Sequence, residues 1–566
     1  MPSLDVSELN IVLGVLGAFI VAYGIISVKI KAQWYLGEAL PAVALGVALG
    51  PIAAKFLDAE RWGSAAPEQQ GAITLGIARV VIGVQLVIAG FQLPAKYQQK
   101  RWAPMIICLL PVMTIMWLFT TSCILLTVPK LTLLTALVIG SCVTCTDPIL
   151  SQAIAKGPFA DKYVRRPLRE LISSEAGAND GFGFPFLMLA VYLIRFANVP
   201  GAGEHTAESV TESAVNATAE LVHRGLLYAR REEEVGRLGG GVGRALGTWA
   251  TETWLYIVFL SVVYGAVVGF GSCKAVKFAL RKGWIDTESY LLWPTGLGLF
   301  IVGTCGAIGT DDLLACFVAG NALNWDGKYL AETEALHDEV NSVMDVILNF
   351  GGFMYIGAIM PFSEFHQPDT TGLTIPRLIA LGFLVLIFRR IPAILMTYKF
   401  MPSCIKDWKE ALFMGYFGPI GIGAVFYIEH TKHLFPEKGE ASDAEVNDLT
   451  EVMVPVVYWL VLFSIIVHGL SIPSLNMIYK WRGIPTIEED DPAEILLLSQ
   501  NTALPKNAHA NPNRKSVMVH NRFSVAPMQI GAPTDFARWN STGNRQQFEK
   551  RGSLDSIDLE KLRQIR

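Results

Sequence analysis

The chain has 566 residues, of which 52% are hydrophobic and 17% are charged, and its formal net charge is −4. A mean hydropathy of +0.40 over this length excludes an ordinary soluble enzyme, because soluble domains carry less apolar sequence. The composition indicates a protein embedded in the lipid bilayer, and no nucleic-acid partner is expected.

About thirteen stretches of the chain are candidate membrane spans, because a helix that crosses a bilayer needs ~20 mostly apolar residues. They predict an all-α polytopic membrane protein. The stretch 310–324 is shorter than the others and is predicted to be a short span or a half-span. The stretches run roughly over residues 9–30, 34–54, 72–93, 103–127, 131–155, 168–197, 250–272, 288–307, 310–324, 341–362, 374–401, 409–430 and 449–473.

The distribution of lysine and arginine predicts the orientation of the spans, because these residues are enriched in short cytoplasmic loops. Alternate short loops are rich in basic residues, which places the N-terminus outside and the C-terminus in the cytoplasm. The loops assigned to the cytoplasm contain Lys29, Lys31, Lys96, Lys100, Arg101, Lys156, Lys162, Arg165, Arg166, Arg169, Lys274, Lys277, Arg281, Lys282, Lys399, Lys406 and Lys409.

The sequence divides into a transmembrane domain, residues 1–479, and a C-terminal region, residues 480–566. The C-terminal region is rich in Asn, Pro, Ser, Arg and Gln and lacks apolar periodicity. It is therefore predicted to be a cytoplasmic, mostly disordered regulatory tail. The transmembrane domain contains one long outer loop, residues 198–249.

Four short motifs are candidate modification sites. Asn216 begins an Asn-Ala-Thr glycosylation acceptor in the predicted outer loop, and the alternative is a chance occurrence of this common tripeptide. In the tail, Ser516, Ser524 and Ser553 each lie one or two residues after a basic residue and are candidates for phosphorylation. Kinases or other regulators that act on the tail are therefore expected partners.

Two of the predicted spans are interrupted by glycine and proline. One contains the run 139–148, which ends in Thr-Asp-Pro, and the other contains the run 416–423, with Gly-Pro-Ile-Gly at its centre. Interrupted spans in two halves of a chain are typical of transporter sites built from half-helices. The alternative is an ordinary kink, since glycine and proline are common in spans.

Two acidic residues in apolar sequence are the leading candidates for a functional site. Asp180 lies within the stretch 168–197, and Asp147 lies in the interrupted span before it. An ionised carboxylate in hydrocarbon costs at least ~2.5–3.5 kcal/mol, so such an acid usually faces a cavity with a function. A shielded carboxylate can hold a proton or an alkali cation, and competition between the two is sufficient for exchange. The alternative is a structural acid paired with a neighbour.

Several neighbours of these acids are candidate ligands or supports. Thr146, Ser173 and Ser174 offer oxygen atoms to a hard cation such as Na⁺. Asn179 is expected either to hold Asp180 by hydrogen bonds or to replace a second negative charge. Asp147 can neutralise the N-terminal end of the half-helix that follows it, bind the cation, or do both.

Charged residues elsewhere in the spans need partners. Glu175 is expected to pair with one of two adjacent arginines, Arg389 and Arg390, which would otherwise point at helix C-termini. Asp311 and Asp312 follow Thr310, a candidate helix N-cap; the alternative for these acids is a vestibule that attracts cations.

Taken together, these residues resemble the fungal plasma-membrane Na⁺/H⁺ antiporters of the monovalent cation:proton antiporter family, over roughly residues 10–475. One departure is Ala176, where the family usually has serine, which leaves the preference for Na⁺ or K⁺ open. The resemblance is carried by the runs 146–148, 175–181, 309–314, 319–322, 325–327 and 417–421.

The resemblance implies an NhaA-like inverted-repeat fold with two crossed, broken helices, and a homodimer. It also implies that Asp180 and Thr146 bind the transported cation with Asp147 close by, and that Asp311 and Asp312 matter for transport. It leaves open whether Arg389 or Arg390 pairs with Glu175.

The implied activity is exchange of cytoplasmic Na⁺, and also Li⁺ and K⁺, for external H⁺ across the plasma membrane, for salt tolerance and pH and cation homeostasis. The alternatives are an antiporter that prefers K⁺ and, in a different class, a cation channel without proton coupling. An enzyme is not expected, because no H-E-x-x-H or G-x-S-x-G motif stands in a suitable context and the nine histidines are scattered. No cofactor and no structural metal are expected.

Overall fold

The structure is a computed structural model that describes residues 8–30, 34–57, 69–156, 158–197, 237–335, 340–439, 441, 443–485, 493–496, 508–511 and 516–519. The chain forms two compact units. The membrane unit comprises residues 1–326 and 339–487, and the second unit comprises residues 327–338 and 488–566.

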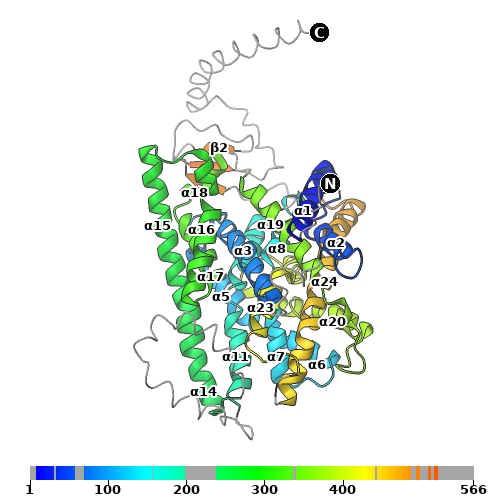
Figure 1. Ribbon diagram of the computed structural model, residues 1–566. Coiled ribbons are helices and arrows are strands. Elements are labelled where there is room, and N and C mark those ends of the chain that lie inside the picture. The colour runs from blue at the N-terminus through cyan, green and yellow to red at the C-terminus, as the bar shows by residue number, and fades with distance from the viewer. Residues whose placement is uncertain are drawn as a thin grey trace, which may run out of the picture. The chain divides into compact units, whose positions relative to one another are not determined.

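The described part of the membrane unit is helical, as predicted, and each of the thirteen predicted stretches contains helix (Figure 1). The helices in its first half are α1 (Glu8–Val28), α2 (Ala39–Leu49), α3 (Gln69–Phe91), α4 (Tyr97–Lys100), α5 (Trp102–Ile107), the π-helical η3 (Cys108–Val112), α6 (Met113–Thr127), α7 (Leu133–Cys142), α8 (Pro148–Lys156), α9 (Pro158–Tyr163), α10 (Arg166–Asn179) and α11 (Phe184–Arg195).

The second half of the membrane unit begins with a helix that is unbroken for 42 residues, Gly241–Lys282. It starts inside the predicted outer loop 198–249, so residues 241–249 of that stretch are helical. The remaining elements are α14 (Gly241–Thr248), the π-helical η5 (Trp249–Phe259), α15 (Leu260–Lys282), α16 (Thr287–Ile308), α17 (Asp312–Leu323), α19 (Val340–Ala358), the 3₁₀ turn η6 (Phe362–Phe365), α20 (Ile375–Phe388), α21 (Ile391–Thr397), the 3₁₀ turn η7 (Tyr398–Phe400), α22 (Trp408–Tyr416), α23 (Ile422–Lys432) and α24 (Ala444–Trp481).

Among the described residues, eight helical runs are long and apolar enough to cross a membrane by length and composition. The other predicted spans either are broken into two helices or contain a shorter helix. At 12 residues, α17 is roughly 18 Å long, as expected for a stretch predicted to be short.

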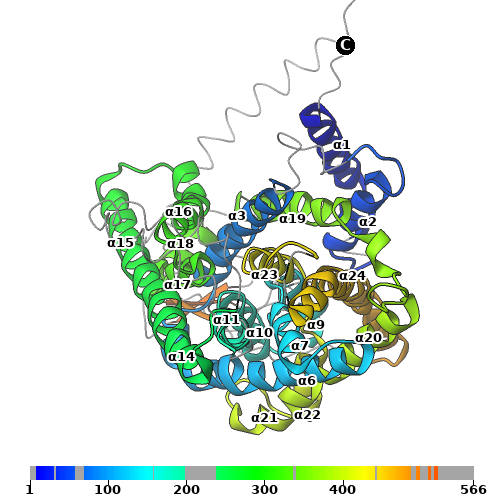
Figure 2. The ribbon, with the colours of Figure 1, turned by 60° about the horizontal axis from the view of Figure 1, so that its bottom comes forward.

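In Figure 2, α7, α10, α11 and α23 lie in the middle of the membrane unit, with α6, α15, α19 and α20 around them. Glycines bring some helix pairs into backbone contact. A Cβ atom at Gly46 of α2 would lie 2.0 Å from the carbonyl oxygen of Met354 in α19, so only glycine allows this approach.

The two predicted breaks are present, and they contact each other. The first separates α7 from α8, and the second separates α22 from α23. The backbone N–H of Asp147 in the first break donates to the carbonyl oxygen of Pro419 in the second, at 2.9 Å. A further interruption, at residues 180–183 between α10 and α11, was not predicted.

The second unit contains α18 (Lys328–Ala335) and a three-stranded antiparallel sheet in the order β1-β3-β2. Its strands are β1 (Ala493–Leu496), β2 (Ala508–Asn511) and β3 (Ser516–Val519), and β1 contacts α18. The sequence predicted no strands in the tail. Ser516 is the first residue of β3, whereas Asn216, Ser524 and Ser553 lie outside the described residues.

Candidate functional site

Asp147 stands where the two breaks meet. Its Oδ1 accepts the N–H of Leu150 in the first turn of α8, at 2.9 Å. Its Oδ2 accepts the N–H of Ile422, the first residue of α23, at 2.7 Å. One carboxylate therefore caps two half-helices at their positive N-terminal ends. Of the roles predicted for Asp147, neutralising the following half-helix is the one that the geometry displays.

Asp180 differs from Asp147 because its carboxylate has no hydrogen-bond partner among the described residues. The residue is 0% exposed, and neither oxygen accepts a hydrogen bond within the described part of the chain. The carboxylate lies against the first turn of α23, where a Cβ atom at Gly423 would lie 2.5 Å from Oδ1. A buried carboxylate without donors is costly, so its charge must be met by a proton or a cation.

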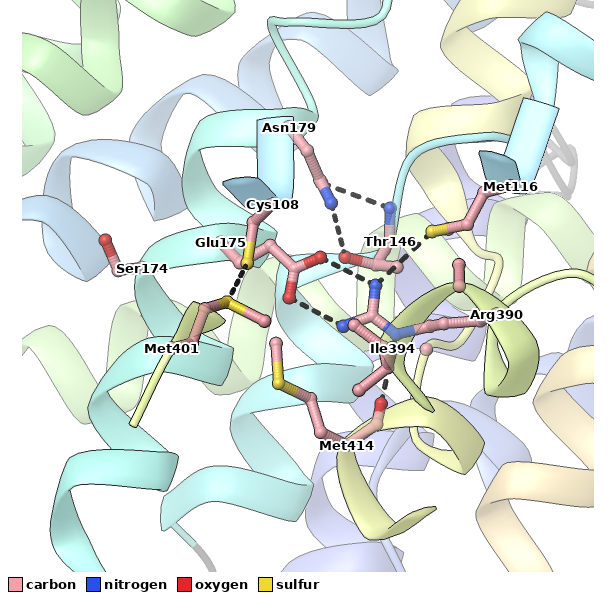
Figure 3. A network of polar contacts seen from close by, with 12 residues as sticks. Cys108, Met116, Thr146, Ser174, Glu175, Asn179, Arg390, Ile394, Met401 and Met414 are labelled. Carbon is pink, nitrogen blue, oxygen red and sulfur yellow. Dashed lines mark hydrogen bonds and ion pairs between the residues drawn. The ribbon is translucent and has the colours of Figure 1, made fainter. Parts of the chain in front are cut away.

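Asn179 holds Thr146 and not Asp180 (Figure 3). Its Oδ1 accepts the N–H of Thr146 at 3.1 Å, and its Nδ2 donates to the Thr146 hydroxyl at 2.8 Å. The prediction that Asn179 bonds to Asp180 is wrong, because consecutive residues of a helix point in different directions. The Thr146 hydroxyl, next to the first break, keeps a lone pair for a cation.

The hydroxyl of Ser174 is directed elsewhere. It accepts from Gln98 Nε2 at 2.8 Å and lies 3.3 Å from the sulfur of Met105. Ser174 therefore contacts α4 and α5 and is not placed as a ligand.

Asp311 and Asp312 begin α17. Asp311, and not Thr310, is the N-cap: its Oδ1 accepts from Leu314 N–H at 3.0 Å, while its Oδ2 is buried without a partner in the described residues. Asp312 accepts from Arg79 Nε at 2.7 Å. This turn adjoins the interruption beside Asp180, since a Cβ at Gly181 would lie 2.5 Å from Leu314 N.

Arg390 is the arginine that pairs with Glu175 (Figure 3). Its two terminal nitrogens donate to the two carboxylate oxygens at 2.7 and 2.6 Å, and both side chains are at most 3% exposed. Its Nε donates to the carbonyl oxygen of Met414 at 3.0 Å. The ion pair ties α10 to the junction of α20 and α21, and the bond to Met414 ties that junction to α22.

Arg389 points at helix C-terminal carbonyls, the alternative that the sequence left open. It donates to Gly418 O and to Cys145 O, each at 2.7 Å, and to Thr144 O at 3.2 Å. A guanidinium suits the negative ends of α7 and α22, so Arg389 holds both breaks from one side.

Three residues that the sequence analysis missed complete the site. The hydroxyl of Tyr427 donates to the backbone oxygen of Asp180 at 2.6 Å and accepts from Gly183 N at 3.0 Å. On α24, Ser464 accepts the N–H of Ile420 at 2.7 Å, and His468 Nε2 lies 3.1 Å from Tyr416 O. Ser464 and His468 are four residues apart in an apolar span, a spacing that could have identified them.

Residues 15–477 match the profile of the family described as sodium/hydrogen exchanger, transmembrane. The chain belongs to this family. The sodium/hydrogen exchangers are membrane transporters and not enzymes, and the predicted resemblance and all-α membrane fold are confirmed at this level.

Individual relatives agree with the family. The chain is 36% identical over 478 residues to a probable Na⁺/H⁺ antiporter of Schizosaccharomyces pombe, covering 83% of this chain and 56% of the relative. It is 33% identical over 484 residues to Na⁺/H⁺ antiporter 2 of Zygosaccharomyces rouxii, covering 84% and 54%. The chain therefore spans about half the length of these curated relatives.

A solved structure matches the fold. The sodium proton antiporter MjNhaP1 from Methanocaldococcus jannaschii aligns with a TM-score of 0.53 and 14% identity, covering 84% of this chain and 97% of that one. At this identity the match supports the fold alone.

Proposed function

We propose that this exchanger moves cytoplasmic Na⁺ outward in exchange for external H⁺, and that Li⁺ and K⁺ are also carried. The observation that carries the proposal is the Asp180 carboxylate, which is fully buried and has no donor among the described residues. Asp147, by contrast, accepts a hydrogen bond at each of its two carboxylate oxygens, so Asp180 is the better candidate to bind either ion. The names of the relatives, which are Na⁺/H⁺ antiporters, support the same activity.

The remaining site residues have supporting roles in the proposal. Thr146 supplies a second oxygen for the cation, and Asn179 fixes Thr146. Asp147 holds the two breaks together, and Asp311 adds negative charge beside the interruption. We further propose a plasma-membrane homodimer, with its C-terminus in the cytoplasm, that serves salt tolerance and pH and cation homeostasis.

Exchange in proteoliposomes tests the proposal. Adding Na⁺, Li⁺ or K⁺ to vesicles with an acidic interior should alkalinise the interior, as read from a trapped pH-sensitive dye. Asp180→Asn should abolish this change while the melting temperature stays within a few degrees. Asp369→Asn, at an exposed loop position, is the matched control. Full exchange in Asp180→Asn would refute the proposal, and current without proton movement would indicate a channel.

A further inference from the structure

A series of side-chain hydrogen bonds, separate from Asp180, connects α3, α19 and the residue before α2. Gln85 of α3 donates from Nε2 to Oδ1 of Asn349 in α19, at 2.7 Å. Asn349 donates from Nδ2 to Oε2 of Glu38, which precedes α2, at 2.8 Å. None of the three residues belongs to the site described above.

The inner end of this series has an oxygen without a donor. Gln85 is 2% exposed, and its Oε1 is buried with no hydrogen-bond partner among the residues described. Leaving a buried carbonyl oxygen unsatisfied costs ~1–3 kcal/mol unless something else meets it. The oxygen belongs to the same amide whose nitrogen donates to Asn349, and Asn349 in turn donates to the Glu38 carboxylate.

The Gln85 end of this series of hydrogen bonds lies close to the point where the two breaks meet. Gly352 of α19 faces both Val81 of α3 and Ile422, since a Cβ there would lie 3.3 Å from each side chain. Gln85 is four residues after Val81, and Asn349 is three residues before Gly352, so both lie one helical turn from this contact. Ile422 is the residue whose N–H binds Asp147.

We propose that Gln85, Asn349 and Glu38 form a second alkali-cation site, on the path between the solution at the start of α2 and Asp180. Two amide oxygens and one carboxylate are the oxygen ligands that hard cations prefer. Glu38 supplies the charge that attracts the ion, and Gln85 Oε1 receives it one turn before the crossing of the half-helices. This inference rests on the proposed function, since it concerns the route of the same ion.

Side-specific kinetics in proteoliposomes test this site. Glu38→Gln keeps an acceptor for Asn349 but removes the charge, and it should raise the KM for Na⁺ applied from the Glu38 side by roughly 3- to 10-fold. The kcat, and the KM from the opposite side, should not change. Gln85→Leu should raise the same KM, and Gln85→Glu, which keeps an oxygen there, should restore it. Glu288→Gln, at an exposed glutamate in the first turn of α16, is the control.

The outcomes separate the two proposals. If the unaltered chain exchanges Na⁺ for H⁺ but Glu38→Gln and Gln85→Leu keep its KM, the second site is wrong and the proposed function stands. A fall in kcat with unchanged KM would assign these residues a structural role and would also overturn the site. If the unaltered chain shows no exchange, both proposals fail. Melting temperatures of the variants identify any loss of fold.

Discussion

The two breaks in the membrane unit look alike in sequence but contribute different things. The first, between α7 and α8, supplies side chains: Thr146 and Asp147 both act through their own oxygen atoms. The second, between α22 and α23, leaves space for the carboxylates of Asp147 and Asp180 and provides a backbone N–H that binds Asp147. Its glycines, Gly421 and Gly423, lie where a Cβ would be 2.1 Å from Asp147 Oδ2 and 2.5 Å from Asp180 Oδ1.

The two breaks are also held in different ways. Arg389 donates to carbonyls of both breaks, Thr144 and Cys145 in the first and Gly418 in the second. The second break has further contacts from α24, through Ser464 and His468. The segment 417–421 has no polar side chain of its own, so its backbone groups depend on polar side chains from other helices. The difference shows that interrupted spans of similar composition need not carry equivalent chemistry.

The largest expected effect comes from filling the room that the second break provides. Gly423→Ala should lower the exchange rate by roughly 100-fold, because the Asp180 carboxylate must shift by about an ångström. The measurement is Na⁺-driven alkalinisation of vesicles. Gly303→Ala, where nothing lies within 4 Å of the added Cβ, should leave the rate unchanged. Normal exchange in Gly423→Ala would mean that the second break does not define the space around Asp180.

A large effect, on stability and not on the exchange rate, is expected at the ion pair between Glu175 and Arg390. Glu175→Gln leaves the Arg390 charge buried and uncompensated, which should lower the free energy of unfolding by ~3–5 kcal/mol. Thermal unfolding in detergent measures it. Glu364→Gln, in a pair with Lys438 whose side chains are 26% and 46% exposed, should cost less than ~1 kcal/mol.

A double variant sharpens this prediction. Glu175→Gln combined with Arg390→Met removes both charges, so it should be more stable than Glu175→Gln alone. If the double variant is less stable than Glu175→Gln, Arg390 stabilises the protein mainly through its bond to Met414 O and not through Glu175.

The smallest expected effect concerns the hydrogen bond between Ser464 of α24 and the backbone N–H of Ile420 in the second break. Ser464→Ala leaves the buried N–H of Ile420 without its acceptor, which should cost ~1–3 kcal/mol of stability and slow exchange only modestly. Ser464→Thr should restore both. Ser474→Ala, at an exposed serine of the same helix, is the control. If Ser464→Ala unfolds at the same temperature as the unaltered chain, α24 does not hold this break.

Much of the fold followed from the sequence because a membrane span leaves a strong compositional signal. All thirteen predicted stretches contain helix, and glycine and proline marked both breaks. The interruption at 180–183 was not predicted because Phe182 within it and Phe184 after it are as apolar as the residues of a continuous span. The strands of the tail escaped because they are four residues long, too short for a recognisable alternation.

Within the site, composition identified the residues but not their directions. The sequence predicted that Glu175 needs an arginine but could not distinguish Arg389 from Arg390. In the structure, α20 ends at Phe388, and the two arginines that follow point in different directions: Arg390 contacts Glu175 of α10, and Arg389 contacts the carbonyls after α7. Likewise, a hydrogen bond to Asp180 was one of the two roles expected for Asn179. Only the folded helix shows that it reaches Thr146.

The helix Gly241–Lys282 has a practical consequence. With 42 residues it extends over roughly 63 Å, about twice the ~30 Å thickness of the hydrocarbon layer. A helix of this length that crosses the bilayer extends beyond the hydrocarbon layer. Probes attached near the two ends of such a helix would lie in opposite compartments. Distances from these probes to the other helices would then measure how far those helices move.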